Sequence, residues 1–127
     1  CNVEELQFFF FRKDSANAVR QMLAPYPTLL SAHTGLYVEI YHRNASKGAA
    51  LSALCQKLGI PKEQVACMGD GENDCSMFAA SGLPLAMGNS AQSLQAMAKA
   101  VLPDNRHDGA AEGIFRYVLE QEPVHNP

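Results

Sequence analysis

The chain has 127 residues, of which 47% are hydrophobic and 18% are charged, and its formal net charge is −3 at pH 7. This composition is typical of a folded globular protein and excludes an intrinsically disordered chain. The Lys and Arg residues are scattered and form no basic cluster, so we expect a small polar ligand and neither a nucleic-acid nor a membrane partner.

The cysteines and the apolar runs predict a cytoplasmic protein. The four Cys residues form no CxxC pair, which favours reduced thiols over a disulfide framework. The longest strongly apolar run, Leu6–Phe11, is far shorter than the roughly 20 residues that a membrane span needs. No signal-peptide pattern opens the chain. Because the chain does not begin with Met, we expect a truncated or processed product.

Residues 1–42 predict the element order β-α-β-β. Leu6–Phe11 is rich in aromatic residues and predicts a strand that is buried on both faces or lies at an interface. A helix capped near Asp14 or Ser15 follows and ends before Pro25. Two short strands are then predicted over residues 28–32 and 35–42. The composition changes near residues 41–44, where we place a boundary between two parts of the chain.

Residues 43–121 predict alternating helices and strands. Ser46 as a cap and Gly59 as a stop bound a helix whose apolar residues are Leu51, Leu54 and Leu58. Strands are predicted over residues 64–69, 83–88 and 100–103. Helices are predicted over residues 72–81, 90–100 and 108–121. This order is typical of βαβ units and predicts an α/β fold with a parallel sheet covered by helices, followed by a frayed tail at residues 122–127.

The stretch GDGEND, residues 69–74, follows a predicted strand and crowds three acids into one turn. Ligands of open parallel sheets bind beyond the carboxyl ends of the strands. The carboxylates of Asp70 and Asp74 and the amide of Asn73 are oxygen donors that suit Mg²⁺ shared with water and a phosphate. The alternative is that Asp70 and Asn73 cap a helix that begins near Glu72.

Lys47 lies in the first turn of the predicted helix, where a cation opposes the helix dipole. A helix N-terminus and a Lys together form a phosphate-binding corner, and a solvated surface Lys is the alternative. Asn89 follows the next strand and could reach the same crevice, with a turn residue as the alternative. The four His residues lack metal-ligand spacing, and we expect them at the surface or in packing.

Three stretches, SKGAAL, MGDGENDCSMFAASGLPLAMGNS and DNRHDGAAEGI, together resemble the C-terminal half of a haloacid dehalogenase (HAD) superfamily phosphatase of the Cof-like branch. The resemblance implies an incomplete Rossmann-like three-layer core with a parallel sheet in residues 43–121. It implies the C-terminal part of an α/β cap in residues 1–42. The implied activity is magnesium-dependent hydrolysis of a small phosphorylated metabolite such as a sugar phosphate, by in-line attack of an Asp on phosphorus.

The resemblance also implies a role for each residue of the motifs. Lys47 would bridge the substrate phosphoryl group and the nucleophile, Asp70 would bind Mg²⁺, and Asn73 would contact the phosphate. Asp74 would support the metal shell or hold the loop, and Glu72 would contact the metal through its backbone or water. Lys47 and Asp70 are therefore the predicted catalytic residues, and Asp70 and Asp74 are the predicted metal ligands.

Half of the implied active site is absent from the chain. The family nucleophile lies in a DxDxT word in the first core strand, and neither a DxD nor the following Ser/Thr motif occurs here. We therefore expect a fragment that is inactive alone. The strand before GDGEND would lack its neighbour and become an exposed edge, which either belongs inside a longer enzyme or pairs with a second copy.

Two other functions are weighed against the phosphatase. A non-catalytic binding or assembly module would keep the fold without the nucleophile half. The phosphorylation domain of a P-type ATPase also carries a GDGxND loop, but the absence of a membrane span and the continuation MGNS and DNRHDG disfavour it.

Overall fold

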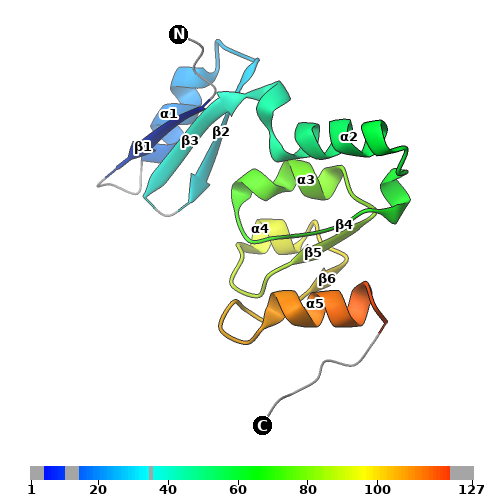
Figure 1. Ribbon diagram of the computed structural model, residues 1–127. Coiled ribbons are helices and arrows are strands. Elements are labelled where there is room, and N and C mark those ends of the chain that lie inside the picture. Colours follow the sequence, from blue (N-terminus) through cyan, green and yellow to red (C-terminus); the bar gives the residue numbers. More distant parts are fainter. Residues whose placement is uncertain (1–4, 11–14, 35, 121–127) are drawn as a thin grey trace.

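A computed structural model describes residues 5–10, 15–34 and 36–120 (Figure 1). The strands are Glu5–Phe9 (β1), Leu29–Thr34 (β2), Tyr37–His42 (β3), Ala66–Gly69 (β4), Leu83–Ala86 (β5) and Ala100–Val101 (β6). The α-helices are Ser15–Leu23 (α1), Lys47–Leu58 (α2), Cys75–Ala79 (α3), Gln92–Gln95 (α4) and Gly109–Tyr117 (α5). Short 3-10 helices cover Arg43–Ala45, Lys62–Gln64 and Glu72–Asp74. The described chain forms a small N-terminal part and a larger α/β part.

The N-terminal part is a three-stranded antiparallel sheet in the order β1-β3-β2, with α1 packed against it (Figure 1). Its buried residues are Val19, Ala32 and Val38. The sequence analysis predicted a strand that is buried on both faces or lies at an interface; burial on both faces is wrong for the described residues, and the interface stays a prediction. β1 is an edge strand, and three of its apolar side chains are exposed, namely Leu6, Phe8 and Phe9. Phe11 lies outside the described residues.

The helix α2, which follows the link between the two parts, is capped at both ends. Ser46 Oγ accepts a hydrogen bond from the Ala49 amide at 3.2 Å, and Gly59 ends α2 in the left-handed conformation, with φ 68°. The predicted cap and stop are both confirmed. Leu54 and Leu58, however, are 53% and 60% exposed, so the described residues do not cover the predicted apolar face of this helix.

The second part is a parallel sheet in the order β4-β5-β6 with helices on both faces. Cys67 of β4 packs in a buried cluster with Phe78 of α3 and Leu94 of α4. The next residue, Met68, points to the other face, where its sulfur lies against Gly113 of α5. Figure 1 shows α3 and α5 on opposite sides of the strands. The predicted three-layer α/β fold is therefore confirmed.

Three helices are shorter than the sequence pattern predicts, and the last of them, predicted over residues 108–121, is α-helical over Gly109–Tyr117. In the predicted helix 72–81, the first turn is a 3-10 helix and only Cys75–Ala79 is α-helical. In the predicted helix 90–100, the helix ends after Gln95. The amide of Met97 bonds to Leu94 O, three residues back, and Lys99 N bonds to Pro84 O at 2.8 Å. Pairing of the chain with the strand β5 therefore ends this helix early.

β4 lies at the edge of the parallel sheet, where its described partner is β5 on one side. The sequence analysis expected this exposed edge, and the sheet order confirms it for the described residues. No helix in the described ranges is long and apolar enough to cross a membrane.

Candidate functional site

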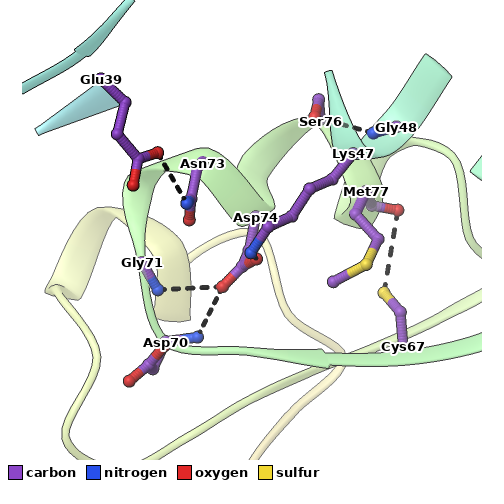
Figure 2. A network of polar contacts seen from close by, with 10 residues as sticks. All are labelled: Glu39, Lys47, Gly48, Cys67, Asp70, Gly71, Asn73, Asp74, Ser76 and Met77. Atoms are coloured by element: carbon purple, nitrogen blue, oxygen red, sulfur yellow. Dashed lines mark hydrogen bonds and ion pairs between the residues drawn. The ribbon is translucent and has the colours of Figure 1, made fainter. Parts of the chain in front are cut away.

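The loop after β4 folds around the side chain of Asp74. This residue is only 3% exposed, and its Oδ2 accepts hydrogen bonds from the backbone amides of Asp70 at 2.9 Å and Gly71 at 3.0 Å. Figure 2 shows both bonds converging on the carboxylate. The sequence alternative, in which Asp70 and Asn73 cap the helix, is wrong in this detail, because Asp74 is the residue that binds the free amides.

Lys47 reaches the same carboxylate from the start of α2. Its Nζ lies 2.5 Å from Asp74 Oδ1, and its side chain is half exposed while that of Asp74 is 5% exposed. The capping bond of Ser46 fixes where the helix begins, and Gly48 N donates to Ser76 Oγ at 3.0 Å, which ties the start of α2 to α3. The fold thus brings Lys47 to the acidic loop, as the resemblance implied.

The hydrogen bonds around Asp74 determine its protonation. Burial raises the pKa of this carboxyl group, but the bonds from Lys47, Gly71 and Asp70 outweigh burial and hold the pKa below its ordinary value. Asp74 is therefore a carboxylate at neutral pH. Both of its oxygens accept hydrogen bonds from donors of the chain itself, and these bonds hold the loop. Its role as a metal ligand stays a prediction.

Asp70 has a different environment from Asp74. Its side chain is exposed and points away from Asp74 (Figure 2), and its Oδ2 accepts a hydrogen bond from Asn89 Nδ2 at 3.3 Å. Asn89 Oδ1 in turn accepts from the amide of Asn105 at 3.1 Å. Residues that follow β4, β5 and β6 are thus joined at one end of the sheet, and Asn89 does reach the crevice of Asp70.

Glu72 and Asn73 turn toward the N-terminal part of the chain. Glu72 contacts Arg20 and the amide of His33, and Asn73 Nδ2 donates to Glu39 Oε2 at 3.0 Å (Figure 2). The sequence analysis did not predict the partners Arg20 and Glu39, and it placed His33 among surface or packing residues. No motif marks these residues, since they become neighbours only through the packing of the two parts.

The donor groups of the loop fit a magnesium ion held by one carboxylate. Among the described residues, no three His, Cys, Asp or Glu side chains gather closely enough to enclose a metal ion. Mg²⁺ does not need such a cage, because it usually takes one or two carboxylates and shares its other positions with water and phosphate. Asp70, exposed at the carboxyl end of β4, has the right chemistry for this role.

A polar cavity of about 250 Å³ lies between the N-terminal sheet and the start of α2. Four of its lining residues belong to one face of β1 and β3, where Glu5 is opposite Tyr41 and Gln7 is opposite Glu39. Lys47 and Asn73 line the cavity from the other side. Burial and the charge of Glu39 raise the pKa of Tyr41, so its hydroxyl group remains a hydrogen-bond donor at neutral pH. The cavity therefore has a basic end and an acidic, hydroxyl-bearing end.

Comparisons with known proteins identify one family. Residues 2–114 match the family model described as haloacid dehalogenase-like hydrolase. The chain is 40% identical over 103 residues to Phosphatase YwpJ of Bacillus subtilis, which covers 81% of this chain and 36% of that protein. It is 34% identical over 86 residues to a phosphoglycolate phosphatase of Methanobrevibacter smithii, covering 68% of this chain and 37% of that protein.

A solved structure gives the same family. A haloacid dehalogenase-like hydrolase from B. subtilis superposes with a TM-score of 0.84 at 32% identity, covering 91% of this chain and 40% of that one. The chain therefore spans well under half the length of the proteins that it resembles.

The network around Asp74 predicts an acid-dependent stability. An acid whose pKa is lower in the folded chain stabilises the fold above its unfolded pKa of about 3.9, and this contribution is lost as the pH falls through the folded pKa. We expect Asp74→Asn to be less stable than the wild type at pH 7 by about 1–3 kcal/mol, with the difference narrowing below about pH 4. Urea unfolding at several pH values measures this.

The matched control is Glu63→Gln, which removes one exposed acid elsewhere and should leave the pH dependence unchanged. A stability difference between Asp74→Asn and wild type that stays constant from neutral pH to about pH 3 would contradict the assignment.

Proposed function

The chain belongs to the haloacid dehalogenase-like hydrolase family, and we propose that it is part of a magnesium-dependent phosphomonoester hydrolase that acts on a small phosphorylated metabolite such as a sugar phosphate. The observation that carries this proposal is the convergence of Lys47 and the Asp70 loop on the buried carboxylate of Asp74. A cation and an exposed carboxylate are thereby fixed near one another at the carboxyl end of a parallel strand.

Each residue of the site has a distinct task in this proposal. The ammonium group of Lys47 attracts and orients the phosphoryl group. Asp74 holds Lys47 extended toward the loop and keeps the Asp70 backbone in place. Asn73 lies on the cavity wall, where its amide contacts the phosphate or Glu39. Mg²⁺ bound by Asp70 would neutralise the charge of the phosphoryl oxygens.

The chain lacks the group that would attack phosphorus. The family resemblance places the nucleophilic Asp in a DxDxT word, and no DxD occurs in the 127 residues. We propose that a longer parent protein supplies this Asp on a strand beside β4, whose open edge offers the place for it. This chain alone would then be inactive, because the covalent route has no first step without a nucleophile.

The alternative is a non-catalytic binding or assembly module, which the missing nucleophile word favours. The coding sequence upstream of residue 1 distinguishes the hydrolase from the non-catalytic module. A DxDGT-like word ahead of the cap supports the hydrolase, and a genuine start codon near Cys1 refutes it.

The polar cavity favours an uncharged, hydroxyl-rich leaving group. Beyond Lys47, its lining holds the two carboxyl groups of Glu5 and Glu39 with the neutral donors of Gln7 and Tyr41. Hydroxyl groups can both donate to the carboxylates and accept from the phenol and amide. A second anionic group on the substrate would instead meet like charge. The cavity therefore suits a sugar phosphate better than a phosphorylated acid such as phosphoglycolate.

Loss of the Lys47 charge tests the phosphate role. We expect Lys47→Ala in the full-length parent to lower kcat for p-nitrophenyl phosphate by about 100-fold or more, since removing one preorganised charge contact costs this much in other sites. The control Lys57→Ala removes an exposed charge from the same helix and should retain wild-type rates. The 127-residue chain should give no turnover. Activity in the purified chain would overturn the proposal that a longer parent protein supplies the nucleophilic Asp.

Substrate charge tests the leaving-group side of the cavity. For the full-length parent, we expect kcat/KM for glucose 6-phosphate to exceed that for phosphoglycolate by about tenfold or more, because like charges repel in a partly buried cavity. Glu39→Gln should narrow this ratio, and Glu112→Gln on α5 should not. A preference for phosphoglycolate would contradict the assignment while leaving the phosphatase activity itself intact.

Magnesium binding by this chain alone should be weak. Besides water, only Asp70 and at most one neighbouring residue would hold the ion, and the strongest sites provide several protein oxygens. We expect titration calorimetry to give a dissociation constant for Mg²⁺ that is well above the micromolar range. Submicromolar binding by the 127-residue chain would show that it contains a complete metal site.

A further inference from the structure

Glu72 links the acidic loop to two elements of the N-terminal part. Its Oε1 lies 2.5 Å from Arg20 Nη2 of α1, and its Oε2 accepts a hydrogen bond from the backbone amide of His33 in β2 at 2.8 Å. β2 is an edge strand of its sheet, so this amide points outward from the edge to the loop. One carboxylate therefore contacts a helix and a strand of the other part.

The neighbouring residue makes a further contact of the same kind. Asn73 Nδ2 donates to Glu39 of β3 at 3.0 Å. Two consecutive residues of the loop thus touch three elements of the N-terminal part. The covalent connection between the two parts runs through the short 3-10 helix Arg43–Ala45, so the loop contacts form a second, separate attachment.

The loop itself is firmly held on the side of the core. Asp74 binds the amides of Asp70 and Gly71 and the ammonium group of Lys47. Glu72 lies between these fixed points, which restricts where its side chain can reach. A cavity of about 410 Å³ lies beside the contact, and Asp70 lines it together with Arg20, His33 and Glu72. The attachment and the exposed carboxylate of Asp70 therefore share one surface.

The ion pair between Glu72 and Arg20 is largely exposed to solvent. The side chains of Arg20 and Glu72 are 48% and 39% exposed, and ion pairs with this exposure contribute little to folding free energy. Its geometry instead determines orientation, because a carboxylate that receives donors from two directions fixes both distance and angle.

We propose that Glu72 is a positioning residue that anchors the cap segment, the described residues 5–10, 15–34 and 36–42, over the Asp70 loop and so sets the width of the polar cavity between Glu39 and Lys47. This inference rests on the proposed function only where it regards Asp70 as the metal ligand. Removal of Glu72 would leave both parts folded and free the cap segment to turn about residues 43–45.

The test uses the 127-residue chain without metal or substrate. We expect Glu72→Ala to increase amide hydrogen exchange at His33 by about tenfold or more, since local opening controls exchange, while amides of β5 keep their wild-type protection. Residual dipolar couplings should show a changed or averaged orientation of the cap segment relative to β4–β6. The melting temperature should remain close to that of the wild type.

Three further variants separate the anchor from a general charge effect. Arg20→Ala removes one donor and should increase motion of α1 while His33 remains protected by Glu72. Glu72→Gln retains an amide oxygen and should lie between wild type and Glu72→Ala in cap orientation. Glu112→Ala breaks an ion pair of similar type with Arg116 within α5 and should change neither readout.

Two results would overturn the inference. One is unchanged exchange at His33 in Glu72→Ala, and the other is an unchanged cap orientation in that variant. Neither depends on phosphatase activity, so failure of the anchor and failure of the proposed function are separate outcomes. A failure of orthophosphate to perturb the Lys47 amide in the wild-type chain would count against the phosphate site alone.

Discussion

The buried carboxylate of Asp74 is the interaction on which the arrangement of the site depends. A carboxylate that is almost fully removed from water is costly unless it is paired and hydrogen-bonded. Here the amides of Asp70 and Gly71 and the ammonium group of Lys47 provide these bonds. The same bonds fix the loop after β4 and draw the start of α2 toward it. Satisfaction of one buried charge therefore assembles residues that are far apart in the sequence.

The crowding of three acids into five positions follows from this arrangement. The three carboxylates point to different donors, so each is compensated separately. Asp74 turns inward to Lys47, Glu72 turns to Arg20 of the cap segment, and Asp70 remains exposed beside Asn89. Like charges repel when they lie close together, and here the three carboxylates point in different directions toward different partners. Of these three acids, Asp70 is the one for which the described residues provide no cationic partner, and it is the residue proposed to bind a metal ion.

The sequence predicts what local chemistry and strand order determine. Ser46 and Gly59 bound α2 because capping and left-handed backbone are properties of single residues. The GDGEND loop could be placed at the carboxyl end of a strand for the same kind of reason, whereas the place of Lys47 in the same site was implied by the family resemblance. The partners Arg20 and Glu39 could not be predicted, because cap residues meet the loop only after both parts pack. Of the two alternatives for β1, burial on both faces was wrong, since aromatic content does not reveal whether a strand lies at an edge.

The contacts that shape the Lys47 and Asp70 side of the proposed site all lie within the described chain. Each hydrogen bond of Asp74 comes from residues between Lys47 and Gly71. The features left uncovered lie elsewhere, at the open edge of β4 and at Leu54 and Leu58 of α2. A parallel sheet is normally covered on both faces and continues at its edges. Neither these leucines nor the edge of β4 takes part in the hydrogen bonds that fix Lys47 and the Asp70 loop.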